Sequence, residues 1–233
     1  MSGLSPDALR PLPRRFFARP VLRVARDLLG RLLVHQTPKG RMVGRIVEVE
    51  AYRGRDDPAS HAYRLTPRSK IMAGLPGMAY VYFSYGNHFC LNVVAEREGR
   101  AAAILLRAVE PLQGIALMAR HRGVDLRDPA ALRRLAAGPG RLTRAMNITG
   151  ADNGRDLTRP PLYIGRGLPG RRLVGRSPRV GVRRAADRPW RFYLRDSPYL
   201  SRAGTSPMRA GTSPRRALPS RRARGAPRMH SRV

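Results

Sequence analysis

Apolar and polar residues alternate between positions 45 and 52, where the sequence reads RIVEVEAY. Side chains that are neighbours along a β-strand point to opposite faces of the sheet. A strand here would therefore turn its valines and its alanine to one face and Glu48, Glu50 and Tyr52 to the other. Two carboxylates and an aromatic ring are expected to share that second face.

A second β-rich pattern covers positions 80–94, with the sequence YVYFSYGNHFCLNVV. It divides into two runs at Ser84-Tyr85-Gly86-Asn87, where the Gly-Asn pair supplies the backbone freedom of a tight turn. We predict a β-hairpin here, with Tyr85 at its tip. Tyrosines on strands more often belong to a core than to a binding surface, and Tyr80 keeps that interpretation.

The N-terminal part of the chain changes pattern near position 20. Positions 1–19 are rich in proline and arginine and show no periodicity, so we expect an arm there. Between positions 20 and 33 apolar residues recur at helical spacing, which predicts a surface helix on a core. Two strands, over 32–36 and 42–52, should follow and form a hairpin that carries Glu50.

The rest of the chain predicts a mixture of helices and strands. The loop over 53–77 is long, and loops of this length are usually functional or disordered. The glycines of GPGRL at 138–142 would let backbone N–H groups approach a phosphate, although a turn that ends a helix is the simpler interpretation. The other predicted elements are a strand over 101–109, helices over 110–120 and 128–137, and final strands over 179–182 and 190–194.

The charge balance favours a polyanionic partner. The chain has 46 Lys and Arg against 15 Asp and Glu, a formal net charge of +31, and only Lys39 and Lys70 are lysines. Nucleic acid is the commonest polyanion that a soluble protein binds, and membrane headgroups are the rival. An arginine-rich codon composition would account for part of the excess, so the sign of the charge is more informative than its size.

The single cysteine, Cys90, excludes an intramolecular disulfide and a zinc site built from several cysteines. A reducing compartment is the simple expectation. No apolar run is long enough for a membrane span, and the start lacks the apolar segment of a secretory signal. We therefore expect a cytoplasmic protein, in the bacterial cytoplasm or nucleoid.

Positions 202–233 are rich in arginine and contain no acidic residue. This composition predicts a disordered Arg-rich tail, which is either a solvated extension or an arm that tethers DNA. One folded domain over 20–201 is expected between the arm and the tail.

A carboxylate beside several tyrosines, in a strongly basic chain, indicates chemistry on a nucleic-acid base. An enzyme that acts on a base in a duplex must extrude the nucleotide, stack it on aromatic faces and fill the space left behind. Hydrolysis of the N-glycosidic bond then needs a general base to activate water against a sugar with oxocarbenium character. Alternation leaves both Glu48 and Glu50 open for that role. The sequence has no metal-binding or phosphate-loop motif, so no cofactor is expected.

Several ordered blocks support a family assignment. They are EVEAY (48–52), SHAY (60–63), TPR (66–68), AYVYFSYG (79–86), CLNVV (90–94), LLRAVEP (105–111), GPGRL (138–142) and RFYLRDSP (191–198). Together they resemble the alkyladenine, or 3-methyladenine, DNA glycosylases. The resemblance implies a single α+β domain with a curved antiparallel β-sheet, flanking helices and a protruding β-hairpin that enters the minor groove. It also implies monofunctional removal of alkylated purines.

The same resemblance implies roles for residues within these blocks. Glu50 corresponds to the base that activates water, and Arg107 to a residue that helps to hold that water. Tyr85 corresponds to the DNA-binding residue that intercalates. The pocket that holds and reads the flipped base would consist of Tyr52, His61, Tyr82 and Asn92.

Some of these roles compete with structural ones. His61 could be a satisfied loop residue, and Arg107 could merely pair with Glu48 or Glu110. Asn92 is expected to discriminate against the amino group of guanine. Asn87 stands where the family commonly has Met, which affects the expected contact with the groove.

The leading hypothesis is a DNA repair glycosylase that acts as a monomer on double-stranded DNA containing damaged purines, with no membrane partner. It would leave an abasic site with the strand intact. No lysine stands in the matched catalytic positions, so a Schiff-base lyase step is not expected. The alternative is a non-catalytic, basic nucleic-acid-binding protein of the same fold.

Overall fold

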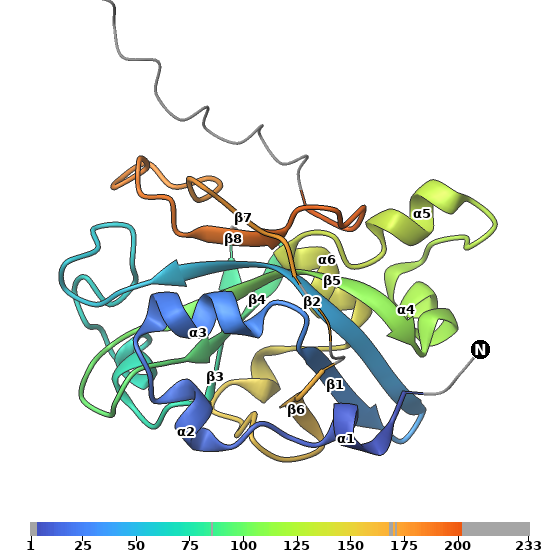
Figure 1. The fold of residues 1–233 in the computed structure, drawn as a ribbon, viewed down its shortest axis with the longest axis horizontal. Helices are drawn as coiled ribbons and strands as arrows, with labels where there is room; N and C mark the ends of the chain where they lie inside the picture. Colours follow the sequence, from blue (N-terminus) through green and yellow to red (C-terminus); the bar gives the residue numbers. More distant parts are fainter. Residues whose placement is uncertain (1–3, 85, 168–169, 171, 202–233) are drawn as a thin grey trace, which may run out of the picture.

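The computed structural model describes residues 4–84, 86–167, 170 and 172–201. The predicted hairpin tip, Tyr85, and the predicted tail lie outside the described residues. One curved antiparallel sheet of eight strands dominates the fold, in the order β3-β4-β5-β2-β1-β6, with β8 on β2 and β7 on β8 (Figure 1). The strands are β1 (Leu32–Thr37), β2 (Gly40–Tyr52), β3 (Ala79–Ser84), β4 (His88–Val94), β5 (Ala103–Gln113), β6 (Leu162–Gly165), β7 (Val174–Ser177) and β8 (Arg191–Leu194).

Helices flank this sheet, so the fold is the single mixed α+β domain that the sequence predicted. The short 3-10 helices are η1 (Lys70–Ala73) and η2 (Gly150–Asp152). The α-helices are α1 (Pro6–Leu9), α2 (Arg14–Phe17), α3 (Val21–Leu28), α4 (Ile115–Arg122), α5 (Pro129–Arg134) and α6 (Pro139–Ala145).

Strand β2 organises the sheet. Its first half pairs with β1 and its residues 48–50 pair with β8, while β5 pairs along its other side. The pairing with β5 shifts register between Ile46 and Val49, so that Val47 on β2 and Arg107 on β5 have no direct partner. Such bulges re-aim side chains and are common beside active sites.

The main hydrophobic core lies on the face of the sheet covered by α3, α4 and α6. Helix α3 packs here because Val21, Val24, Ala25 and Leu28 recur at the spacing of one helix face, and all four are buried. Each fully buried Val or Leu side chain contributes about 1.5–3 kcal/mol. On the opposite face of β2, Val43 packs in a smaller apolar cluster, whereas Glu50 and Tyr52 near the end of the strand are polar.

Residues from Leu4 to Arg19 pack against the sheet, whereas the sequence predicted an arm. The backbone N–H of Leu12 donates a 2.8 Å hydrogen bond to the carbonyl of Ile164 on β6. Phe17 is fully buried in the main core. The buried apolar residues of this segment are isolated from one another in the sequence, so they form no periodic pattern.

Three predicted elements differ from the structure. The helix predicted over 110–120 begins only at Ile115, because β5 continues to Gln113 and Gly114 turns the chain with a φ of 73°. The GPGRL segment begins α6 instead of ending a helix, with Pro139 in its first turn. The strand predicted over 179–182 is wrong, since β7 ends at Ser177 and a loop leads to β8.

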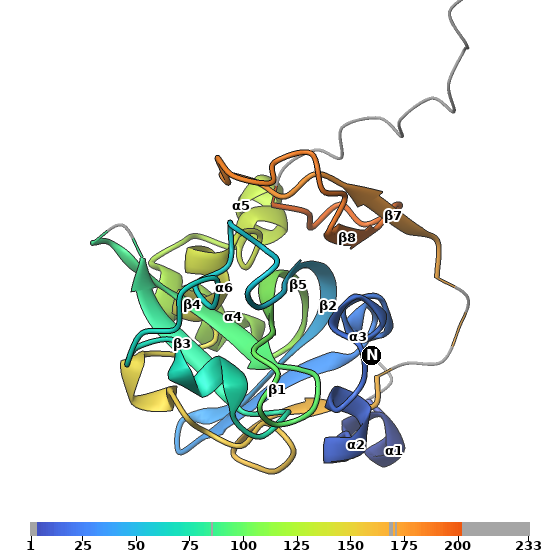
Figure 2. The same ribbon diagram turned by 90° about the vertical axis from the view of Figure 1, so that its left-hand side faces the viewer.

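Strands β3 and β4 form the predicted hairpin, paired from Ala79 with Val93 to Ser84 with His88. Its outer end projects from the body of the domain (Figure 2), and Phe83 on it is 50 % exposed. Within the described ranges, no helix has the length and apolar character needed to cross a bilayer.

Candidate active site

A cavity of about 530 Å³, here called the Glu50 cavity, lies on the sheet face opposite the main core. Val49 and Ala51 belong to that core, whereas Glu50 and Tyr52 line the cavity, as strand alternation predicts. The loop at 58–59, the hairpin and the segment 180–184 complete its walls. The predicted site residues that line it are Glu50, Tyr52, His61, Tyr82 and Arg107.

Glu50 is buried, yet its carboxylate faces this cavity. The Tyr52 hydroxyl donates a 2.8 Å hydrogen bond to Oε2, and the backbone N–H of Val180 donates a 2.7 Å hydrogen bond to Oε1. The Nη1 atom of Arg107 lies 3.3 Å from Oε2. Two hydrogen bonds and one cation therefore fix the orientation of the carboxylate.

Arg107 forms ion pairs with both glutamates of β2, Glu48 and Glu50. It is the unpaired residue of the bulge in β5, and its Nε donates a 2.9 Å hydrogen bond to Oε1 of Glu48. Its Nη1 faces Glu50. Glu110, the other partner considered from the sequence, pairs with Arg45. Arg107 thus pairs with Glu48 and also reaches the cavity.

Glu48 is sealed from the cavity by hydrogen-bond donors. Its Oε1 accepts from Arg107, from Nε of Arg191 at 2.8 Å and from the hydroxyl of Ser201 at 2.7 Å. Its Oε2 accepts from the backbone N–H of Ser201 at 2.6 Å. Burial alone would raise the pKa of Glu48, but Arg107 and Arg191 outweigh it and lower the pKa below its ordinary value. Of the two carboxylates, Glu50 is the one that the cavity wall presents.

Aromatic rings form the wall near the hairpin. Nδ1 of His61 hydrogen-bonds the hydroxyl of Tyr80 at 2.9 Å, and the His61 ring meets that of Tyr82 edge-on at 4.7 Å between centroids. Tyr80 is buried in a small cluster with Ala62 and Met72, in keeping with the structural interpretation of this residue. Tyr82 and His61 are the rings that the cavity offers.

The ionisable groups of this wall are held neutral. Burial, followed by the nearby Arg68, lowers the pKa of His61 below its ordinary 6.5. Burial raises the pKa of Tyr82 far above that of a free tyrosine, and burial together with Glu50 does the same for Tyr52. The wall therefore presents uncharged aromatic faces at neutral pH.

Asn92 lies behind this wall. It is buried, and its Nδ2 donates a 3.0 Å hydrogen bond to the carbonyl of Tyr80. It lines a small recess of about 20 Å³ with Tyr52, His61 and Tyr82, and it does not line the Glu50 cavity itself. The predicted pocket residues are thus neighbours, with Asn92 one layer deeper.

Two arginines of the site received no role from the sequence. The buried Arg179 donates to both oxygens of Asp57, at 2.6 and 2.8 Å, and its guanidinium lies 4.6 Å from the centre of the Tyr52 ring. Arg68 lies 5.0 Å from the centre of the Tyr82 ring and donates to the carbonyl of Phe83. The TPR block contains Arg68, but no local pattern marks Arg179.

No group of three or more His, Cys, Asp and Glu side chains that could hold a metal ion comes together in the described part of the chain. Near the hairpin, His61 hydrogen-bonds Tyr80 and His88 contacts the side chain of Asn87. Cys90, also on the cavity wall, is a free cysteine.

Comparison with known proteins places this chain in a family. The model of the methylpurine-DNA glycosylase family matches residues 15–198. A protein of Rhodopseudomonas palustris is 50 % identical over 197 residues, which cover 84 % of this chain and 90 % of the relative. A relative from Alkaliphilus oremlandii is 43 % identical, and the match covers 82 % of this chain and 98 % of the relative. A relative from Methanocella arvoryzae is 47 % identical, and the match covers 82 % of this chain and 96 % of the relative. All three are named "Putative 3-methyladenine DNA glycosylase". The chain belongs to the methylpurine-DNA glycosylase family.

Proposed function

We propose that this protein is a DNA repair glycosylase that removes alkylated purines, including 3-methyladenine, from double-stranded DNA. It hydrolyses the N-glycosidic bond and leaves an abasic site. The observation that supports this most directly is the carboxylate of Glu50, held by Tyr52 and Val180 on the wall of a cavity with aromatic faces. Family membership and the names of the relatives agree with it.

Glu50 is the general base of the proposed reaction. A water between Glu50 and the C1′ atom of a flipped nucleotide would give a proton to the carboxylate as its oxygen bonds to C1′. The bond from C1′ to the base breaks, its electron pair leaves with the base, and the sugar passes through an oxocarbenium-like state. Arg107, 3.3 Å from Glu50 and anchored on Glu48, would help to hold that water.

The aromatic wall suits a cationic base. Many alkylated purines carry a positive charge, and cations are attracted to the faces of tyrosine rings. Tyr52, Tyr82 and His61 would hold the flipped base, and an uncharged His61 would not repel it. The cavity volume of about 530 Å³ falls within the range of roughly 300–1,000 Å³ typical of small-molecule sites. Asn92 would act from the recess behind, against the amino group of guanine.

Contact with the duplex is assigned to the hairpin. Tyr85 follows the last residue of β3 in the sequence and lies outside the described residues. We give it the intercalating role because of its position in the AYVYFSYG block, where a bulky aromatic residue would fill the space of the extruded base. The protein would act as a monomer in the cytoplasm or nucleoid.

The reaction is expected to stop at the abasic site. A lyase step needs an amine that forms a Schiff base with the sugar. The sequence contains two lysines, Lys39 and Lys70, and neither lines the Glu50 cavity.

The direct test is incubation of the protein with a methylated duplex in the presence of a chelator. We expect free methylated purines and sites that break only on alkaline treatment, with an unmethylated duplex as the control. Tight binding without base release would favour the non-catalytic DNA-binding protein. Strand breaks before alkali would contradict the monofunctional assignment.

A further inference from the structure

A second cavity, of about 720 Å³, lies against the other face of the β3–β4 hairpin. Tyr82 and Cys90 pair across the hairpin and line the Glu50 cavity. Phe83 and Phe89, the next pair outward, line the second cavity. The two cavities meet at Phe83, His88, Arg107 and Pro139, which line both. Paired side chains alternate between the faces of a β-ribbon, so the two cavities flank the hairpin.

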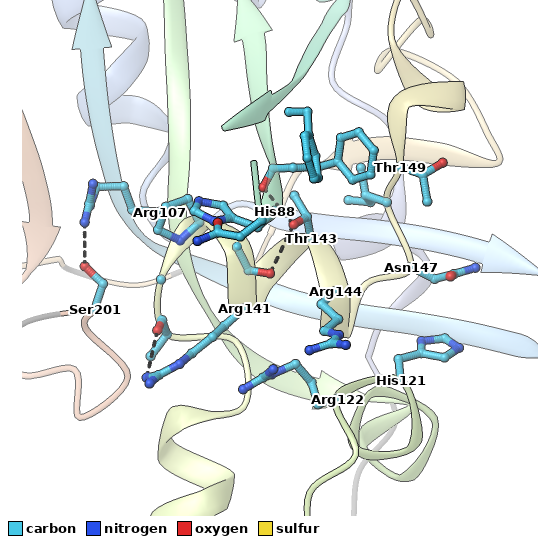
Figure 3. Close-up of a pocket in the computed structure, with 18 residues that line it drawn as sticks. His88, Arg107, His121, Arg122, Arg141, Thr143, Arg144, Asn147, Thr149 and Ser201 are labelled. Carbon is cyan, nitrogen blue, oxygen red and sulfur yellow. Dashed lines mark hydrogen bonds between the residues drawn. The ribbon is translucent and has the colours of Figure 1, made fainter. Parts of the chain in front are cut away.

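Four arginines line this second cavity, which we call the arginine cavity (Figure 3). None of the described residues that line it is Asp or Glu. Figure 3 shows the side chains of Arg122, Arg141 and Arg144 close together, from α4 and α6. Its basic side chains are His88, Arg107, His121, Arg122, Arg141 and Arg144.

Arg107 is paired with Glu48 and Glu50, but among the described residues no acidic side chain forms an ion pair with Arg122, Arg141 or Arg144. Arg122 donates to the carbonyl of Leu135 at 3.1 Å and Arg141 to that of Ala137 at 3.5 Å, both uncharged acceptors. Burial and the proximity of Arg141 and Arg144 lower the pKa of Arg122. A concave cluster of like charges attracts an anion, because the anion relieves the repulsion between them.

Helix α6 holds the arginines in a fixed relation to the hairpin. The hydroxyl of Thr143 donates a 2.9 Å hydrogen bond to the carbonyl of Phe89 on β4. Gly140 packs so closely that a Cβ atom there would lie 2.6 Å from the ring of His88. Arg141 and Arg144, on the same short helix, are exposed. A ligand in the arginine cavity would therefore be held in a fixed position relative to strand β4 of the hairpin.

We propose that the arginine cavity binds backbone phosphates of the undamaged DNA strand. This inference rests on the proposed function, in which the hairpin enters the groove between the two strands. The damaged strand must lie on the Tyr82 face, because its nucleotide enters the Glu50 cavity. The complementary strand then lies on the Phe89 face, where the arginines are. Phosphates are the anions that DNA offers there, and Arg binds them in a fork of hydrogen bonds.

Single uncharged phosphates in the DNA test this assignment. A duplex with an abasic-site analogue would carry one methylphosphonate at a time, on either strand, near the analogue. We expect a methylphosphonate at certain positions of the undamaged strand to weaken binding by the wild-type protein several-fold. The same methylphosphonates should not weaken binding further when the protein carries Arg144→Gln or Arg141→Gln. Each variant should also lower the slope of log affinity against log salt by about 0.9 for each phosphate that the protein no longer neutralises.

Two controls accompany these variants. Arg23→Gln removes the same charge from the exposed face of α3, which lines neither cavity and lies away from β3 and β4 in Figure 2, so it should keep the methylphosphonate effect. Arg144→Lys keeps the charge and should retain most of the salt slope. Sensitivity confined to the damaged strand, or to neither strand, would overturn the assignment.

Base release from methylated duplex would be measured with the same wild-type preparation. If a methylphosphonate on the undamaged strand weakens binding only while the arginines are present, and no base is released, the phosphate site is supported and the proposed function is refuted. If base is released but the methylphosphonate effect does not depend on the arginines, the proposed function is supported and the phosphate site is refuted.

Discussion

The backbone N–H of Val180 donates a 2.7 Å hydrogen bond to Oε1 of Glu50, across 130 residues of sequence. Val180 belongs to the loop between β7 and β8, which forms one wall of the Glu50 cavity. The preceding residue, Arg179, is anchored on the buried carboxylate of Asp57. The carboxylate that we propose as the general base is therefore oriented by a distant loop as well as by its own strand.

Removing this N–H should slow the reaction. Val180→Pro lacks the donor, and a hydrogen bond to a charged group contributes about 1.5–3 kcal/mol, so we expect base release to fall roughly 10- to 150-fold. Affinity for duplex DNA should change little. Single-turnover release from methylated duplex, with binding measured separately, checks this. Val180→Ala keeps the N–H and should resemble the wild type, and equal rates for the two variants would contradict the role of this hydrogen bond.

Loss of Asp57 should destabilise the fold. The Asp57–Arg179 pair is fully buried, with N–O distances down to 2.6 Å, and removing one partner leaves a buried charge uncompensated. Asp57→Ala is expected to lower the free energy of unfolding by about 3–5 kcal/mol in urea titrations. The neighbouring Asp56 forms an exposed pair with Arg53, so Asp56→Ala should cost less than about 1 kcal/mol. Similar losses for both variants would show that the buried pair is not the anchor.

Glu48 should contribute to stability in a pH-dependent way. Its pKa in the folded protein lies below the ordinary 4.5, so the unfolded chain binds a proton first as the pH falls. Its stabilising contribution is present above about pH 4.5 and is lost as the pH falls through the folded pKa. Glu48→Gln should flatten the dependence of melting temperature on pH below 4.5, as measured by thermal unfolding. An unchanged acid profile would contradict the ion pairs with Arg107 and Arg191.

His61 should remain neutral to lower pH than a free histidine. Burial and Arg68 lower its pKa below 6.5, so the unfolded chain takes up a proton before the folded protein does. Stability is therefore lost as the pH falls below 6.5, and His61→Asn should reduce that loss. An NMR titration of the imidazole protons, with the His61→Asn spectrum identifying the resonance, gives the midpoint. A midpoint above 6.5 would contradict a neutral cavity wall.

The alternation of residues 45–52 was sufficient to predict the shared face of β2. In the structure Arg107 contacts both glutamates, and the Tyr52 hydroxyl donates to Glu50. The hairpin and the α+β class were confirmed for similar reasons, because their turns and periods are local properties of the sequence. The roles given to the individual side chains remain proposals.

Long-range features had no local signal. Arg179 and Asp57 are 122 residues apart, and an arginine in a segment rich in Gly, Pro and Arg resembles any solvated arginine. The choice between Glu48 and Glu50 depends on Ser201 and Arg191, which cover one carboxylate and leave the other facing the cavity. Alternation places both on one face and cannot distinguish them.

The central claim is that Glu50 takes the proton from water. The most direct measurement is single-turnover base release by Glu50→Gln on methylated duplex, with affinity for the same duplex measured in parallel. A carboxamide of nearly the same shape cannot accept that proton, and general base catalysis contributes roughly 10²- to 10⁴-fold. We expect release to fall by at least about 10²-fold with affinity retained. Release at the wild-type rate by this variant would contradict the role of Glu50 as the general base.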